Sequence, residues 1–293
     1  MKKLILIPIL LLSILCNAQF TKGGGMFLKT GSSFMTAPVV PPPDFYDEYN
    51  TIYAAFTTKP HDTIAEIQEA LVYSLDTAGY WDRMDLFYVF ASHDSVSAYI
   101  NWKDPGTFDA FEGTTGYTWN QWEGFTGNGT NARIRTGWIA NDDAVNYTLN
   151  SASMGVYTRT NLAEGVSYYI AGAYSSGFGT LQLAFTTGTS TQWRINSTAD
   201  YESSTAAPPG MFIVSRTAAD ACALYKNGAL VEAVADASVA LPVAEFYALN
   251  VRNGTANQIS ILYVMNGTAN ATEADEINDI IETYMDALGK GIQ

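Results

Sequence analysis

Cysteine and histidine are scarce in this chain of 293 residues, with two of each. Cys16 lies in a segment that we expect to be removed, so the mature chain cannot form an intramolecular disulfide. Cys222 lies in a predicted strand, where a small buried hydrophobic residue is favoured over a nucleophile. His61 and His93 alone do not provide a histidine-based zinc site.

Basic residues are also few. Lys and Arg total 15 against 29 Asp and Glu, which gives a net charge of −14. This balance argues against nucleic acid as a partner, because electrostatic binding to phosphates requires a basic surface. What the chain does have is apolar and aromatic: 47% and 13% of its residues. Tyr and Phe with frequent Thr and Gly favour β structure.

The first eighteen residues have the pattern of a secretory signal. Lys2 and Lys3 precede an apolar run from Leu4 to Leu15, and Ala18 is the expected cleavage point. The run is shorter than the ~20 residues of a spanning helix, so no membrane span is expected after cleavage. Cleavage removes two lysines and takes the net charge from −14 to −16. The signal resembles those of exported Bacteroidota proteins and predicts a secreted or cell-surface location, while lipidation of Cys16 stays open.

Residues 19–60 are expected to form an extended Gly/Pro-rich arm. Gly23–Gly25 and Pro41–Pro43 bracket a segment without helical periodicity. Such a segment is a flexible tether, or an arm that orders only against a partner. Aromatic residues between 26 and 58 offer contacts to a neighbouring subunit, so a homo-oligomer held by this arm is one prediction.

Two helical segments flank the central part of the chain. Residues 61–92 are expected to form a helical segment that packs on the rest, with Asp62 or Thr63 as the N-cap and Glu66 closing a capping box. Within it, residues 86–90 fit either a short helix or a buried strand. Residues 271–293 predict a C-terminal helix capped by Thr272.

Between the helices, residues 93–270 predict a mainly β domain. Short strands separated by turn residues, with no helix-length pattern among them, indicate an antiparallel sandwich. Asn227-Gly228 predicts a type I′ hairpin. In Phe125–Trp138 a Gly-Asn-Gly turn precedes an alternating strand, with Ala132 and Ile134 against Arg133 and Arg135, and we interpret the stretch as the opening strand of the sandwich. The clearest expected strands are 132–136, 152–159, 167–174, 180–186, 191–195, 210–216, 221–226, 229–234, 244–251 and 257–264.

Three of these motifs resemble a known family. The strand–Asn-Gly–strand unit at 224–231, the glycine-rich strand at 124–137 and the passage into the last helix at 267–277 are similar to concanavalin A-like, laminin-G-like jelly rolls. The run from Leu86 to Asp94, followed by 101–110, resembles phage and prophage virion-associated proteins with this fold. The resemblance covers about residues 62–291. It implies an antiparallel jelly-roll β-sandwich with an N-terminal helix and a C-terminal closing helix.

Candidate site residues come from two clusters. Trp119, Asn120 and Trp122, with Trp102 on an Asp-Pro-Gly turn, could provide an aromatic platform and an amide for a glycan. The alternative is that these tryptophans close the end of the core. Because laminin-G-like domains often hold calcium at the rim, Asp142 and Asp143 are candidate Ca²⁺ ligands. Their alternative is a solvated acidic loop, and no other cofactor is expected.

The function predicted from these observations is surface binding or assembly by an exported, non-enzymatic jelly-roll protein, at a cell surface or in a virion. The alternative is a carbohydrate-binding, lectin-like module. A glycoside hydrolase is the disfavoured third class, because no predicted strand carries the two carboxylates that most glycosidases use. Glu273, Asp275 and Glu276 begin a helix and serve its N-terminus instead.

Overall fold

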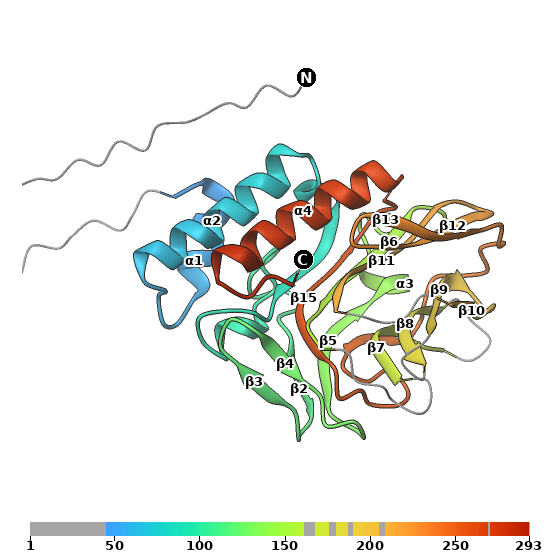
Figure 1. Cartoon of the computed structure of the whole chain (residues 1–293), viewed down its shortest axis with the longest axis horizontal. Helices are drawn as coiled ribbons and strands as arrows, with labels where there is room; N and C mark the ends of the chain where they lie inside the picture. Colours follow the sequence, from blue (N-terminus) through green and yellow to red (C-terminus); the bar gives the residue numbers. More distant parts are fainter. Residues whose placement is uncertain are drawn as a thin grey trace, which may run out of the picture. The chain divides into compact units, whose positions relative to one another are not determined.

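The computed structural model describes residues 45–160, 168–175, 180–186, 190–204, 209–268 and 270–292. Two antiparallel sheets form a sandwich, and helices cover the outer face of one sheet (Figure 1). The mainly β fold with an N-terminal and a C-terminal helix is therefore confirmed. The predicted signal and the Gly/Pro-rich part of the predicted arm lie outside the described residues.

The described strands make an eight-stranded sheet, called sheet A, in the order β13-β12-β11-β6-β15-β4-β3, with β1 also paired to β15. β15 lies inside this sheet, with β6 on one side and β1 and β4 on the other. The strands are β1 Met84–Val89, β3 Thr118–Asn120, β4 Gly124–Thr126, β6 Ala152–Thr158, β11 Gly210–Ala218, β12 Ala221–Lys226, β13 Ala229–Val234 and β15 Gln258–Met265.

A second, seven-stranded sheet, called sheet B, has the order β10-β9-β8-β7-β14-β5-β2. All pairings recorded in it are antiparallel. Its strands are β2 Phe111–Thr114, β5 Arg133–Ile139, β7 Tyr168–Ala173, β8 Thr180–Thr186, β9 Ser190–Ser197, β10 Tyr201–Ser203 and β14 Glu245–Ala248.

Sheet A is buried on both faces. Every residue of β6 and β15 is buried, because alternate side chains enter two different cores. Val156 and Leu262 pack between the sheets, and Tyr157, Ile261 and Tyr263 pack under the helices. This explains why these strands read as continuous apolar runs.

The helical layer is built from α1 Asp47–Ala55, α2 Asp62–Thr77 and α4 Ala271–Ala287, which pack over sheet A (Figure 1). α2 contacts both α1 and α4. The shorter elements are α3 Ala140–Asp143 and the 3₁₀ turns η1 Trp81–Arg83 and η2 Ser97–Tyr99. No helix among the described residues is long and apolar enough to cross a membrane.

The segment around α1 differs from the expected extended arm. Residues 47–55 are helical, and Phe45, Tyr49 and Phe56 are buried in the core of this same chain. The aromatic spacing therefore serves intramolecular packing in this part. The segment 86–90, which fitted a helix or a strand, belongs mostly to β1.

Phe125–Trp138, interpreted as the opening strand, contributes to two strands: the expected strand at 132–136 corresponds to β5, and Phe125 and Thr126 belong to β4. β4 belongs to sheet A and β5 to sheet B, and the chain crosses between the sheets at 127–132. The Asn128 Oδ1 atom accepts hydrogen bonds from the amides of Thr130, Asn131 and Ala132 at 3.0, 2.9 and 2.9 Å. An asparagine turn, which competes with strand geometry, thus divides the stretch.

Both predicted helix caps are displaced by a residue or two. His61 caps α2, with its Nδ1 accepting from the Thr63 amide at 3.3 Å. Asn270 caps α4, accepting from the amides of Thr272 and Glu273 at 2.9 and 3.2 Å. The Asn227-Gly228 hairpin is as predicted, since both residues have positive φ and join β12 to β13 by a two-residue loop.

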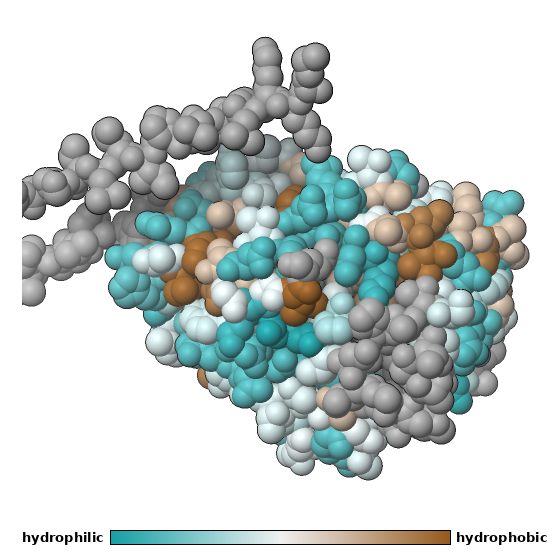
Figure 2. Space-filling view, in the orientation of Figure 1, coloured by the Kyte–Doolittle hydropathy of each residue, from teal (hydrophilic) through white to brown (hydrophobic). Residues whose placement is uncertain are grey.

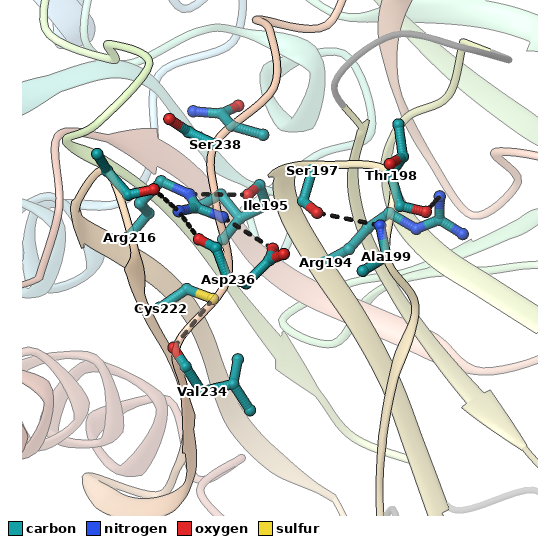
Figure 3. A network of polar contacts seen from close by, with 12 residues as sticks. Arg194, Ile195, Ser197, Thr198, Ala199, Arg216, Cys222, Val234, Asp236 and Ser238 are labelled. Atoms are coloured by element: carbon teal, nitrogen blue, oxygen red, sulfur yellow. Dashed lines mark hydrogen bonds and ion pairs between the residues drawn. The ribbon is translucent and has the colours of Figure 1, made fainter.

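A buried arginine joins the two sheets at one end of the sandwich. Arg216 of β11 is fully buried and donates from Nε to the Ile195 carbonyl of β9 at 3.0 Å (Figure 3). Its Nη1 donates to the carbonyls of Ala219 and Asp236 at 3.0 and 2.6 Å, and Nη2 pairs with the Asp236 carboxylate at 3.0 Å. One side chain thus gives hydrogen bonds to carbonyls of both sheets and their connections, and its own buried donors are satisfied.

Candidate functional site

Trp102 does not offer its ring to a ligand. It is 1% exposed and packs among Tyr49, Phe56 and Phe87 under the helices. The expectation that it belongs to a surface platform is corrected here. The aromatic residues of α1, whose helical position the sequence reading did not foresee, cover this ring.

Trp119, Asn120 and Trp122 lie on the β3–β4 hairpin, and Trp119 packs on the other side of sheet A from Trp102. Trp119 is half-buried against the inter-sheet core, and its Nε1 donates to the Phe90 carbonyl at 2.9 Å. Asn120 is exposed, and Trp122 is half-buried with φ of 64°. The structure therefore gathers three of the four predicted residues, but the Trp119 N–H is already engaged with the protein.

Asp142 and Asp143 lie in α3. The Asp143 Oδ2 accepts the Ile139 amide at 2.7 Å, and the Asp142 Oδ1 accepts the Asn141 side-chain amide at 2.9 Å. Within the described ranges no three His, Cys, Asp or Glu side chains gather where they could hold a metal ion. These two carboxylates therefore have local bonding roles and no third acidic ligand near them.

A groove of about 940 Å³ lies between α2 and α4. The surface on this side of the molecule alternates between hydrophobic and hydrophilic patches (Figure 2). The groove has one exposed ring, Tyr73, and no basic side chain among its lining residues. Its apolar lining includes Ile67, Leu71 and Ile280, and its acidic lining is Glu66, Asp275, Glu276 and Asp279.

His93, Asp94 and Ser97 meet at the turn before η2. His93 Nε2 lies 3.0 Å from Asp94 Oδ2 and 3.2 Å from Ser97 Oγ. In a Ser-His-Asp triad the acid holds Nδ1 and leaves Nε2 for the serine, so this arrangement differs. Asp94 Oδ1 also accepts the Ser97 amide at 2.8 Å, and burial lowers the pKa of His93. This cluster fixes a turn.

The outer face of sheet B carries a different set of side chains. Directly paired residues of an antiparallel sheet point to the same face, and the strand register aligns one row across six strands. Neighbours such as Ile134, Ala248, Leu183 and Trp193 fill the core, so the row itself faces outward. Its members are Phe111, Arg135, Tyr247, Gly172, Gln182 and Arg194.

We call these six residues the sheet B row, and aromatic rings alternate with a guanidinium group in its first three members, Phe111, Arg135 and Tyr247. The Arg135 guanidinium lies 5.0 Å from the Phe111 ring centre, and Arg133, two residues along β5, lies 4.4 Å from the Tyr247 ring centre. Both distances suit cation–π attraction. Phe111 is 43% exposed. The rings are thereby held in place by arginines rather than buried.

Arg135 and Arg133 differ in whether they pair with a carboxylate. Arg135 donates to both oxygens of Glu245, from Nε at 3.1 and 3.0 Å and from Nη2 at 2.6 Å, and this carboxylate raises the pKa of the Arg135 guanidinium. Arg133 forms no ion pair with a carboxylate of the described residues, and its buried Nε has no acceptor. The face therefore retains hydrogen-bond donors for an outside ligand.

The sequence reading missed most of this face. The alternation of Arg133 and Arg135 with apolar residues did place both arginines on the polar side of a strand. What it could not supply was the register that brings residues 111, 182, 194 and 247 beside them, because those pairings join distant parts of the chain.

Comparison with known proteins adds the fold class. No protein-family model and no curated protein matches the chain. Among solved structures, a mutant Trypanosoma rangeli sialidase displaying trans-sialidase activity is similar over 78% of this chain and 40% of its own, at 11% identity and a TM-score of 0.54. The receptor-binding domain of a botulinum neurotoxin C/D mosaic serotype is similar over 68% of this chain and 51% of its own, at 13% identity and a TM-score of 0.51.

A third structure, the receptor-binding domain of botulinum neurotoxin D, gives 12% identity and a TM-score of 0.51 over 68% of this chain and 53% of its own. The chain thus spans about two fifths to one half of the solved chains that it matches. At these identities the likeness shows the fold, a jelly-roll-like β-sandwich. The finer resemblance to virion-associated proteins stays a prediction.

The prediction that the chain is not an enzyme is contradicted by these neighbours, because 40% of each of these sialidase chains shares its fold, at 10–11% identity. The exclusion depended on finding no pair of carboxylates on one strand. That test does not apply to sialidases, which use a tyrosine nucleophile. In this chain burial raises the pKa of Tyr88 well above its ordinary value, and the charges of Asp109 and Glu245 raise it further.

Proposed function

We propose that the chain is an exported carbohydrate-binding β-sandwich, secreted or held at the cell surface, and that the outer face of sheet B holds the glycan. The observation that carries this proposal is the sheet B row, with rings and a guanidinium group alternating in its first three members. The predicted signal at residues 1–18 supports the location.

The chemistry of the row suits a sugar. An exposed ring provides a flat apolar surface, and a guanidinium provides a planar fork of donors for hydroxyl groups. Glu245, which pairs with Arg135, has carboxylate oxygens on the same face. Phe111, Arg135 and Tyr247 are the members of the row that solvent reaches, whereas Gly172, Gln182 and Arg194 are buried. Neighbouring strands lie ~4.8 Å apart, so the part from β2 to β14 spans about 10 Å, which favours at least two sugar rings over a single one.

The solved neighbours support the same class of ligand. One of them is the Trypanosoma rangeli sialidase in complex with 2,3-difluorosialic acid, a sugar derivative. The groove between α2 and α4 supports it less well, because its lining combines one exposed ring with an acidic rim and lacks basic donors.

The proposal is tested by glycan-array screening of a chain that starts at residue 19, followed by calorimetric titration of the strongest glycan. Tyr247→Ala should weaken binding at least about ten-fold, which is ~1.4 kcal/mol. Tyr73→Ala is the matched control, since this tyrosine is 52% exposed on α2, beside the groove. It should leave the affinity unchanged.

The competing location is the β3–β4 hairpin. If Trp122→Ala abolishes binding while Tyr247→Ala does not, the glycan site belongs to the hairpin and the sheet B proposal fails. If the array shows no glycan at all, the proposed function itself fails.

Assembly through the predicted arm stays a separate prediction, because residues 19–44 lie outside the described ones. Light scattering on chains that start at residue 19 and at residue 45 tests it. A larger mass for the longer chain alone supports an arm-mediated oligomer, and equal monomeric masses exclude it.

A further inference from the structure

One end of the sheet B row carries two arginines and two tyrosines in contact. The Arg252 guanidinium lies 4.2 Å from the Tyr174 ring centre and 5.8 Å from that of Tyr169. Arg194 lies 6.0 Å from the same Tyr174 ring. Tyr169 belongs to a small apolar cluster with Ala184 and Val251, against which Tyr174 packs. We call Tyr169, Tyr174, Arg194 and Arg252, together with Gln182, the arginine–tyrosine cluster.

Several polar atoms of this cluster lack partners. Arg194 is 6% exposed and donates from Nη1 to the Thr198 carbonyl at 3.3 Å (Figure 3) and from Nη2 to the Asp200 carboxylate. Its buried Nε–H has no acceptor among the residues that the structure describes. Gln182 donates from Nε2 to Asp200 at 2.9 Å, whereas its buried Oε1 receives no hydrogen bond from the described part of the chain. A buried polar group without a partner is destabilising, unless a ligand or water satisfies it.

The cluster also has more positive than negative charge. Asp200 is shared by Arg194 and Gln182, and the exposed Arg252 has no ion pair with any carboxylate of the described residues. Glu202 lies on the neighbouring edge strand β10 and accepts from the Ser190 hydroxyl. Burial lowers the pKa of Arg194; Tyr169 and Tyr174 raise it, and Arg252 lowers it again. The two guanidinium groups thus repel each other, and the Asp200 carboxylate, which pairs with Arg194, offsets one of the two positive charges.

This imbalance is local in a chain whose net charge is −14. A strongly acidic protein repels anions in general. A site that concentrates unpaired guanidinium donors therefore selects for an anion that also makes specific contacts.

We propose that the arginine–tyrosine cluster is a subsite for the carboxylate of an acidic sugar. The inference rests on the proposed function and names the class of glycan that the sheet B row takes. A carboxylate matches the planar donor fork of a guanidinium and accepts two parallel hydrogen bonds. The half-buried ring of Tyr174 provides an apolar surface beside it, and Tyr169 is buried in the cluster against which Tyr174 packs. The carboxylate would accept from Arg252 and from the unpaired Nε–H of Arg194.

The test compares a pair of ligands that differ in one group. The first is a glucuronic acid-containing oligosaccharide, and the second is the same oligosaccharide with its carboxyl groups reduced to hydroxymethyl groups. Calorimetric titration of the chain starting at residue 19 should give at least a ten-fold tighter binding of the acidic form. In Arg252→Gln the ratio should fall to about two or less. Lys103→Gln, which removes a cation paired with Asp82 away from the cluster, should keep the full ratio.

Two failures are distinguishable. Equal affinity for both oligosaccharides overturns the carboxylate subsite and leaves the proposed function standing, whereas binding of neither contradicts both. A sulfated neutral oligosaccharide that binds as tightly as the acidic one would show a general anion site instead.

A second measurement does not depend on the choice of oligosaccharide. The side-chain Nε–H signals of the arginines are followed by NMR during titration with D-glucuronate and, separately, with D-glucose. The Arg194 signal should shift with glucuronate only. No shift with glucuronate, with the fold intact by its amide spectrum, overturns the inference.

Discussion

Arg216 is a single buried residue whose hydrogen bonds connect the two sheets of the sandwich. It lies on β11 of sheet A, yet its Nε donates to β9 of sheet B and its Nη atoms reach the loop at Asp236 (Figure 3). The side chain is fully buried, so the Asp236 carboxylate and the surrounding carbonyl groups, rather than water, stabilise its positive charge. A buried ion pair of this kind contributes little net energy, but breaking it leaves an uncompensated charge.

We therefore predict that Asp236→Ala, which leaves Arg216 charged and buried, lowers the free energy of unfolding by about 3–5 kcal/mol. Replacing both partners in Arg216→Met/Asp236→Leu should cost less than the sum of the two single changes. Urea unfolding measures all three variants. Lys103→Met, which breaks an exposed pair with Asp82, is the control and should change stability little. Additive single effects would contradict this account.

Among elements, the β12–β13 hairpin and α4 constrain each other. Gly228 has φ of +77°, and a Cβ added there would lie 2.3 Å from Asp275 Oδ1 and 2.6 Å from Asp275 Cα. The glycine is thus needed twice, for the type I′ turn and for the approach of the first turn of α4. Gly79 has nearly the same φ, +78°, with no atom within 4 Å of its added Cβ.

Comparing Gly79→Ala with Gly228→Ala separates the backbone strain of a positive φ from the steric clash of an added Cβ with α4. Gly79→Ala should cost about 1 kcal/mol through its positive φ alone. Gly228→Ala should cost at least about 1 kcal/mol more, because α4 must shift as well. Thermal unfolding of both variants measures the difference. Equal costs would mean that the hairpin and α4 do not press on each other.

The N-terminus of α4 offers a second test among the elements. Asn270, and not the predicted Thr272, accepts the first free amides of the helix. Asn270→Ala should therefore lower the free energy of unfolding by about 1 kcal/mol, and Asn270→Ser should retain most of it. Thr272→Ala serves as the control, and a larger loss there than at Asn270 would restore the sequence-based assignment.

The elements that the sequence predicted well are those with local causes. The pattern predicted β8, β12 and β13 at the bounds that the structure has, because alternation and turn residues act over a few positions. Strands β2, β3, β4 and β10 were not predicted as separate strands, since three or four residues carry too little alternation. Caps were misplaced by one or two positions because several residues near each start can cap.

The candidate site was less predictable than the fold. Trp102 and the tryptophans of the β3–β4 hairpin attracted attention by their type, although burial decides whether a ring can meet a ligand. The sheet B row consists of ordinary residues that acquire meaning only through pairings such as Phe111 with Arg135. No property of residue 111 alone indicates its partner.

For the whole molecule, buried tyrosines determine the pH above which the folded state loses stability. Burial is the main cause that raises the pKa of six of them, all at most 2% exposed: Tyr49, Tyr88, Tyr147, Tyr157, Tyr263 and Tyr284. Below pH 10 these groups are protonated in both the folded and the unfolded chain. Above it only the unfolded chain releases the protons, so stability is lost as pH rises.

Each such tyrosine removes ~1.4 kcal/mol per pH unit above about pH 10, and six together remove on the order of 8 kcal/mol. We predict a cooperative unfolding within roughly one or two pH units above pH 10. Between pH 8 and pH 11.5 the urea midpoint of unfolding should fall over the same pH range in which the tyrosinate absorbance rises. Gradual ionisation of all tyrosines without loss of the folded circular dichroism signal would contradict the prediction.

The place of β15 inside sheet A has a consequence for synthesis. This strand contains residues 258–265, yet it pairs with β6, with β4 and with β1, which begins at Met84. A ribosome must therefore synthesise the chain as far as residue 265 before β1 meets its neighbour. Until then β1 and β6 expose unpaired edges, which makes the nascent chain a client for chaperones and gives premature termination before residue 258 no stable product.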